Sequence, residues 1–249
     1  MLKNKLINNE FTIGSWITIG NLDVAEIMAK ANYDWLVIDL EHSSISIDKA
    51  GDLIRTIDLC GVPPLVRLTS NDANQIKRVM DAGAHGIVVP MIKNQVEAEY
   101  AVSATRYAPQ GSRGVGLGRA QGFGAEFKKY LKWQTNGPVV IAQIEHIDAI
   151  ENLEAIISVP GIDGIIIGPY DLSCSMGIPG QFENDYFISI MRDIQKTGAK
   201  MNIPTGIHIV EPDMKLLKKS IKDGYNFIAY SVDIRMLDVS SREAVKSVK

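Results

Sequence analysis

Residues 34–39 read DWLVID, and Leu40, Glu41 and His42 follow directly. Residues 35–38 are all apolar, so a strand formed by them has two hydrophobic faces. Strands of this kind are typical of parallel sheets whose two faces are both covered. The acid Glu41 and the imidazole of His42 directly after such a strand indicate that a polar site lies where the buried strand ends.

The rest of the chain repeats this unit, because short Val- and Ile-rich runs alternate with segments of helical periodicity. The predicted strands are 12–17, 34–39, 64–68, 86–90, 138–144, 163–168, 203–209 and 226–232. The predicted helices are 22–30, 47–59, 72–82, 94–105, 147–158, 186–197, 212–222 and 235–246. Eight such units in 249 residues predict one α/β domain over 1–249, a closed parallel (β/α)8 TIM barrel.

An open, doubly wound sheet is the alternative fold. No G-x-G-x-x-G motif follows the first strand, which argues against the dinucleotide-binding version of that sheet. Residues 107–136 are extra, a glycine-rich stretch and a short helical segment inserted after the fourth unit. Long insertions in compact domains are often functional loops, and the aromatic residues of 115–133 predict burial on the barrel or on a neighbouring copy.

Composition excludes several classes of function. The net charge is only −3, which argues against nucleic acid or an anionic membrane as the main partner. No run approaches the roughly 18 apolar residues of a membrane span, and residues 1–10 are too polar for a signal peptide. The two cysteines, Cys60 and Cys174, lack metal-type spacing. We therefore expect a cytoplasmic protein that acts on a small molecule.

Polar residues gather at the carboxyl ends of the predicted strands, where active sites of these barrels lie. Glu41 and His42 end the second strand, and Arg67 ends the third. Further along the chain lie Gln143 and Glu145, then Asp171, His208 and Asp233. An unpaired guanidinium in a buried strand is costly, so Arg67 requires a carboxylate partner or an anionic ligand. For His208 and Asp233 we favour structural roles.

Glu145 and Asp171 follow neighbouring strands and form a pair of carboxylates. Oxygen ligands suit a hard cation, Mg²⁺ or Mn²⁺, with water and substrate in the remaining positions. A general acid and base pair, as in glycosidases, is the alternative. The short spacer between Gly168–Pro169 and Asp171 favours the cation, because glycine lets the backbone approach a ligand closely.

Four stretches also match, in order, the segments of one family. They are 33–44 (YDWLVIDLEHSS), 63–92 (PPLVRLTSNDANQIKRVMDAGAHGIVVPMI), 107–116 (YAPQGSRGVG) and 142–180 (AQIEHIDAIENLEAIISVPGIDGIIIGPYDLSCSMGIPG). In these stretches the chain resembles the HpcH/HpaI class II pyruvate aldolases. Macrophomate synthase and a citrate synthase of siderophore biosynthesis share that fold. The resemblance therefore leaves a condensing, citrate-synthase-like reaction open.

The resemblance implies an aldolase that cleaves a 4-hydroxy-2-keto acid reversibly to pyruvate and an aldehyde through a metal-stabilised enolate. It implies Mg²⁺ or Mn²⁺ held by Glu145 and Asp171, and a trimer or hexamer in which a terminal helix docks on a neighbour. The implied catalytic residues are His42, oriented by Asp39, and Arg67 on the keto oxygen. The implied substrate-binding residues are Gln143, Gly168, Pro169 and Trp16.

Overall fold

The computed structural model describes residues 2–249 and confirms the predicted barrel. In this range eight parallel strands pair in sequence order, and β8 pairs with β1 to close the sheet. The strands are β1 (Thr12–Ile17), β2 (Trp35–Asp39), β3 (Pro64–Arg67), β4 (Gly86–Val89), β5 (Val139–Ile144), β6 (Gly164–Ile167), β7 (Thr205–Ile209) and β8 (Phe227–Val232). Each predicted strand is present, with ends shifted by at most two residues.

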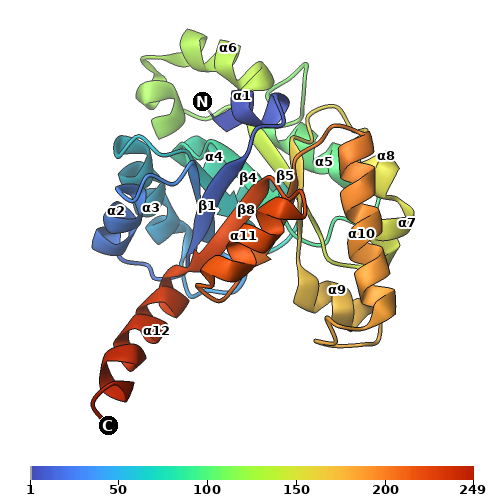
Figure 1. Cartoon of the computed structure of the whole chain (residues 1–249). Coiled ribbons are helices and arrows are strands. Elements are labelled where there is room, and N and C mark those ends of the chain that lie inside the picture. The colour runs from blue at the N-terminus through green and yellow to red at the C-terminus, as the bar shows by residue number, and fades with distance from the viewer. Residues whose placement is uncertain (1) are drawn as a thin grey trace.

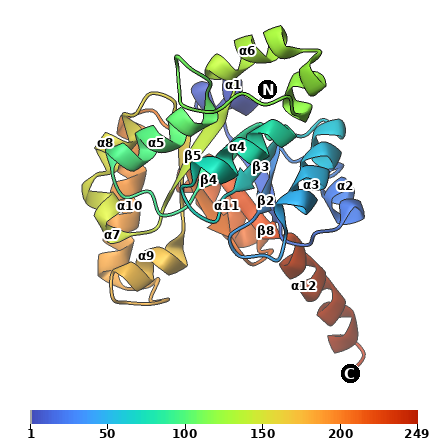
Figure 2. The ribbon, with the colours of Figure 1, turned by 180° about the vertical axis from the view of Figure 1, so that it is seen from behind.

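The helices surround the sheet, as Figures 1 and 2 show from opposite sides. They are α1 (Leu2–Ile7), α2 (Leu22–Ala29), α3 (Ile47–Leu59), α4 (Ala73–Ala82), α5 (Gln95–Thr105), η1 (Arg119–Gly124), α6 (Phe127–Asn136), α7 (Ile147–Glu151), α8 (Leu153–Ile157), α9 (Pro169–Ser175), α10 (Asp185–Lys200), α11 (Met214–Lys222) and α12 (Asp233–Lys246). The predicted helix 147–158 is divided at Asn152 into α7 and α8. None of the helices in residues 2–249 has the length and hydropathy needed to cross a membrane.

Two hydrophobic layers explain the apolar run at 35–38. Trp35 and Val37 belong to the cluster inside the barrel, whereas Leu36 and Ile38 belong to the layer between the strands and the helices. All four side chains are fully buried. A strand in this position has no face that contacts water, so apolar residues occupy both faces.

The barrel interior is filled by large side chains. The Trp35 ring stacks on Phe227 with ring centroids 4.2 Å apart. A Cβ atom at Gly14 would lie 2.2 Å from the Trp35 ring, so a glycine is required on the neighbouring strand. Stacked aromatic rings at this separation bury much apolar surface and are therefore a large part of the inner core.

Helix α1 is not predicted by the sequence pattern, because residues 1–10 show too few apolar residues for a clear helical period. It closes the amino-terminal end of the barrel, where Leu2 and Leu6 join the inner hydrophobic cluster. Lys3 Nζ lies 2.6 Å from Asp163 Oδ1 and donates to the Pro138 carbonyl over 2.8 Å. These contacts tie the helix to the segments that precede β5 and β6.

The insertion lies at the amino-terminal end of the barrel, since it connects the end of α5 to the start of β5 (Figure 1). Its predicted helical segment is present as α6, and the end of the glycine-rich stretch before it forms the short helix η1. Tyr130 packs on its own chain and accepts a hydrogen bond from Arg113 Nη2 over 2.7 Å. Phe123 is 71% exposed, so the aromatic residues of this segment are divided between burial and solvent.

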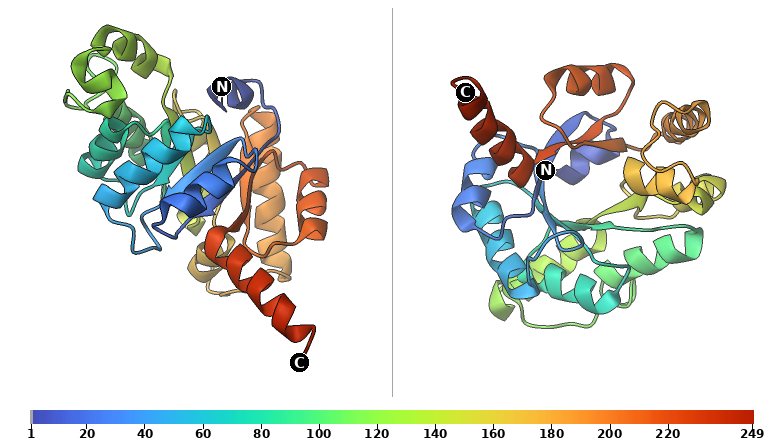
Figure 3. Two further views of the ribbon diagram at one scale, coloured as in Figure 1. Left: turned by 90° about the vertical axis from the view of Figure 1, so that its left-hand side faces the viewer. Right: turned by 90° about the horizontal axis from the view of Figure 1, so that it is seen from below.

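Helix α12 extends away from the barrel, as the left-hand view of Figure 3 shows. Ile234, Leu237 and Val245 along it are each about half exposed or more. By contrast, the first residue of the helix, Asp233, is buried. The helix is therefore anchored at its start and carries apolar side chains in solvent.

Candidate active site

A small cavity of about 80 Å³ opens where the strands end. The predicted residues in its wall are Trp16, Arg67, Gln143, Gly168, Pro169 and Asp171. His208 also lines it. Residues from β1, β3, β5, β7 and the β6–α9 junction thus meet at one end of the barrel, as the positions of polar residues in the sequence indicated.

Arg67 is held by a buried carboxylate. Its Nε and Nη2 donate to the two oxygens of Asp39 over 2.9 and 2.6 Å, and Nη1 lies 3.3 Å from Glu41 Oε2. Burial alone would raise the pKa of Asp39, but the hydrogen bonds and charge of Arg67 outweigh burial and lower that pKa. The guanidinium carbon lies 4.4 Å above the Trp16 ring, so this fork has one fixed orientation.

His42 is placed through the backbone. Asp39 Oδ1 accepts hydrogen bonds from the backbone N–H groups of Glu41 over 3.0 Å and His42 over 3.3 Å. The His42 ring is exposed, and its Nε2 lies 3.8 Å from Glu41 Oε2. Asp39 therefore fixes the turn that carries His42, while the acid beside the imidazole is Glu41.

Glu145 is a buried carboxylate at the end of β5, with 3% of its surface exposed. Its Oε1 accepts from the Met91 backbone N–H over 2.7 Å, and its Oε2 accepts from the Gln143 amide. Burial, together with the charges of Glu41 and Asp171, raises the pKa of Glu145 to about 7, although these hydrogen bonds act to lower it. Three carboxylates thus repel one another at this end of the barrel.

Gly168 leaves room for Glu145. A Cβ atom at this position would lie 2.7 Å from Glu145 Oε2, inside van der Waals contact. Pro169 starts α9 directly afterwards, and Asp171 lies exposed in the first turn of that helix. The G-P-x-D spacing therefore brings a second carboxylate near Glu145 without displacing it.

These residues fit a hard divalent cation. Glu145 and Asp171 supply oxygen atoms, and the buried Gln143 Oε1 has no hydrogen-bond partner. Within residues 2–249, three or more His, Cys, Asp or Glu side chains nowhere gather as a complete metal site. A cation held by two carboxylates would complete its shell with water and substrate, which is usual for Mg²⁺.

Asp233 and His208 lie at the ends of the last two strands, and the structure differs from the prediction for one of them. Asp233 is structural, as expected, because it accepts from the Thr18 backbone N–H over 2.9 Å and the Thr18 hydroxyl over 2.6 Å. His208, for which we also favour a structural role from sequence, lies in the cavity wall. Its place at the end of β7 is the available sequence signal, since the other site residues follow strands in the same way.

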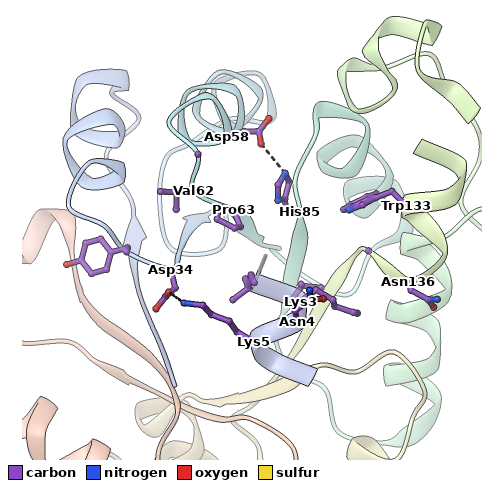
Figure 4. A pocket seen from close by; sticks show the side chains of 15 residues that line it. Lys3, Asn4, Lys5, Asp34, Asp58, Val62, Pro63, His85, Trp133 and Asn136 are labelled. Atoms are coloured by element: carbon purple, nitrogen blue, oxygen red, sulfur yellow. Dashed lines mark hydrogen bonds and ion pairs between the residues drawn. The ribbon is translucent and has the colours of Figure 1, made fainter. Parts of the chain in front are cut away.

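A larger cavity, of about 720 Å³, lies at the opposite end of the barrel near α1 (Figure 4). His85 Nε2 lies 3.0 Å from Asp58 Oδ1, and Lys5 Nζ lies 2.7 Å from Asp34 Oδ1. The polar groups of this cavity thus include two pairs that contact each other, His85 with Asp58 and Lys5 with Asp34. Active sites of such barrels lie at the carboxyl-terminal end, so the small cavity is the candidate active site.

The chain is similar to known proteins over most of its length. The model of the HpcH/HpaI aldolase/citrate lyase family matches residues 12–238. A hydroxypyruvate/pyruvate aldolase of Sagittula stellata is 38% identical over 226 residues, which cover 90% of this chain and 88% of that protein. Relatives of this kind are named as aldolases, which are carbon–carbon lyases.

Two solved structures are also similar. A crystal structure of an HpcH/HpaI aldolase/citrate lyase family protein from Burkholderia cenocepacia has a TM-score of 0.93 at 30% identity and covers 99% of this chain and 98% of its own. The citrate synthase SbnG has a TM-score of 0.84 at 28% identity, with the same two coverages of 99% and 98%. The chain therefore belongs to the HpcH/HpaI aldolase/citrate lyase family, whose aldolases are carbon–carbon lyases.

Proposed function

We propose that this chain is a class II aldolase that depends on Mg²⁺ or Mn²⁺ and reversibly cleaves a 4-hydroxy-2-keto acid to pyruvate and an aldehyde. One observation carries the proposal. The Arg67 guanidinium, the Gln143 amide and the Asp171 carboxylate line a cavity of about 80 Å³, a space for a molecule of only a few heavy atoms, and the Glu145 carboxylate packs directly behind its wall against Gly168 and Gln143.

Glu145 and Asp171 would hold the cation, which when bound supplies positive charge to polarise the keto group. Arg67 would donate to the keto oxygen, where negative charge develops as the carbon–carbon bond breaks. Asp39 keeps the guanidinium oriented before substrate arrives, and such preorganised donors typically contribute about 10²–10³ in rate.

A base must take the proton of the C4 hydroxyl for cleavage. We assign this role to His42, whose exposed imidazole lies beside Glu41. Imidazole suits the task because its ordinary pKa is near neutrality, and a positioned general base typically contributes about 10²–10⁴-fold. The Gly168–Pro169 segment, at the start of α9, would bind the carboxylate of the keto acid.

Removal of the cation is expected to abolish turnover. Pyruvate release from a 4-hydroxy-2-keto acid, followed by coupling to lactate dehydrogenase, should stop in EDTA and return when Mn²⁺ or Mg²⁺ is added in excess. The coupling enzyme with added pyruvate serves as the control in the same buffers. Turnover that persists undiminished in the chelator would contradict the assignment of Glu145 and Asp171 as ligands.

A condensing reaction is the second candidate, because the citrate synthase SbnG has nearly the same fold at 28% identity. Such an enzyme would join a carbon nucleophile to a keto acid without releasing pyruvate. Oxaloacetate with acetyl-CoA, followed by detection of free thiol, distinguishes the two. Thiol release with no pyruvate-forming activity would favour the condensing enzyme.

We also propose that the protein works as a homo-oligomer, a trimer or hexamer in which α12 docks on a neighbouring copy. The exposed Ile234, Leu237 and Val245 on this projecting helix support the proposal. Multi-angle light scattering at micromolar concentration should give a mass of three or six chains. Replacing Leu237 by Asp should shift the protein towards monomer, whereas replacing the exposed Lys246 by Asp should not; a monomeric parent protein would rule the proposal out.

A further inference from the structure

His208 has a defined tautomer. Its Nε2 lies 3.1 Å from the Ser231 carbonyl oxygen, which can only accept a hydrogen bond. Nε2 therefore carries the proton, and Nδ1 keeps a free lone pair as an acceptor. Across residues 2–249 no protein group donates to Nδ1, and this atom is not sealed from the cavity that the side chain lines.

The carbonyl that fixes this tautomer is itself held in an unusual conformation. Ser231 has a φ of 54°, in the left-handed region, where the register between β8 and β1 shifts. The Ser15 hydroxyl donates to the neighbouring Tyr230 carbonyl over 2.8 Å and lies 3.3 Å from the Ser231 carbonyl. The Ser231 hydroxyl donates to Val210 O over 2.9 Å. Strained backbone held in this way is often part of a functional site.

The ring is also fixed relative to Arg67. The His208 and Trp16 rings lie 5.3 Å apart, and the Arg67 guanidinium lies on Trp16 at 4.4 Å. Burial lowers the pKa of His208 to about 4, so the ring is neutral near pH 7. The neutral His208 ring, with Nδ1 as an acceptor, thus lines the same cavity as the Arg67 guanidinium.

The geometry points to a role in substrate choice, and this inference rests on the proposed function. The carbonyl carbon of a 2-keto acid bears an oxygen, a carboxylate and carbon 3. With the oxygen at Arg67 and the carboxylate at Gly168–Pro169, carbon 3 is left for the wall formed by Trp16 and His208. We infer that His208 selects a 2-keto acid with a hydroxyl on carbon 3, which donates to Nδ1. Among 4-hydroxy-2-keto acids, those that also carry a hydroxyl on carbon 3 would then be preferred, and they release hydroxypyruvate where the others release pyruvate.

Carbon–carbon bond formation between such a keto acid, of the hydroxypyruvate type, and an aldehyde needs no further reactant. Carbon 3 loses a proton to a base and forms a bond to the aldehyde carbon, and the aldehyde oxygen takes up a proton. No electron is gained or lost overall. An unsubstituted methyl group at carbon 3 would leave the Nδ1 lone pair without a donor, which costs affinity in a desolvated site.

The test measures how fast the carbon 3 protons of hydroxypyruvate and of pyruvate exchange with D₂O. The exchange is followed by NMR on protein loaded with Mg²⁺ and free of Mn²⁺. His208→Leu removes the acceptor at similar volume. It should lower the ratio of kcat/KM for hydroxypyruvate over pyruvate about tenfold, mainly through KM, since an unmade hydrogen bond costs about that factor. His208→Asn keeps an acceptor at the Nδ1 position and should retain most of the ratio.

The outcomes distinguish failure of the role of His208 from failure of the aldolase proposal. An unchanged ratio in His208→Leu, with pyruvate exchange still measurable, would overturn the role of His208 and leave the aldolase proposal standing. Exchange of neither substrate by the parent protein would overturn the aldolase proposal and this inference with it. If circular dichroism shows that the leucine variant does not fold, His208→Asn and His208→Gln are compared instead, since glutamine lacks an acceptor at the Nδ1 position. The same ratio of kcat/KM should then fall in His208→Gln and not in His208→Asn, and equal ratios would overturn the role of His208.

Discussion

Replacing Arg67 by Ala is expected to lower kcat for pyruvate release by about 10²–10³-fold. The guanidinium is the fixed positive group of the cavity, held by both oxygens of Asp39 and resting on Trp16. Its loss removes a donor that was oriented before the substrate bound. Steady-state kinetics of the coupled assay at saturating Mg²⁺ measure the effect.

The same substitution also leaves Asp39 as a buried, unpaired carboxylate, and removing one partner of such a pair typically costs about 3–5 kcal/mol of stability. Arg67→Lys is the matched control, because it keeps the charge but loses the two-pronged contact. Its kcat should fall between those of the parent and of Arg67→Ala. Near-parental turnover in a folded Arg67→Ala protein would show that the guanidinium has no part in the reaction.

Replacing Glu145 by Gln is expected to lower turnover at least about 100-fold, because the neutral amide is a poor ligand for a hard cation. Isothermal titration of Mn²⁺ should show the matching loss of affinity. The control is Glu154→Gln, the same chemical change at an exposed acid on α8, and it should leave both measurements unaltered.

The same Glu145→Gln protein should be more stable than its parent at pH 8 when EDTA is present. The pKa of Glu145 is raised from 4.5 to about 7 in the folded chain, so the folded state holds a proton that the unfolded state releases. The parent therefore loses stability as the pH rises from about 4.5 to about 7. Glutamine does not titrate, and the variant should gain about 3 kcal/mol over the parent at pH 8 and almost nothing at pH 4.

Urea denaturation at the two pH values measures this gain. Saturating Mg²⁺ should reverse it, because a ligand that binds only the folded parent stabilises the parent alone. A variant that is less stable than the parent at pH 8 in EDTA would mean that Glu145 is already compensated by protein groups and has no need of a cation.

The barrel, and the end of it at which the polar side chains gather, were predictable from local patterns. Residues 35–38 are apolar on both faces because one face packs inside the barrel and the other under the helices, and the sequence shows both directly. Glu145 and Asp171 follow strands that are neighbours in space as well as in sequence. The strands pair in the order in which they occur in the sequence, and polar residues lie at or just after their ends, so both features can be recognised in the sequence alone.

Helix α1 and the partners of the site residues required the folded chain. Leu2 and Leu6 look like isolated apolar residues until the open end of the barrel supplies a surface to bury them. The contact of Asp39 with Arg67 joins β2 to β3, and His208 meets Ser231 through a bulge of β8. Residue types and their spacing along this chain were sufficient to predict its architecture and the end of the barrel at which its polar residues gather. Hydrogen-bond partners depend on distances between strands, and these distances are set only when the barrel closes.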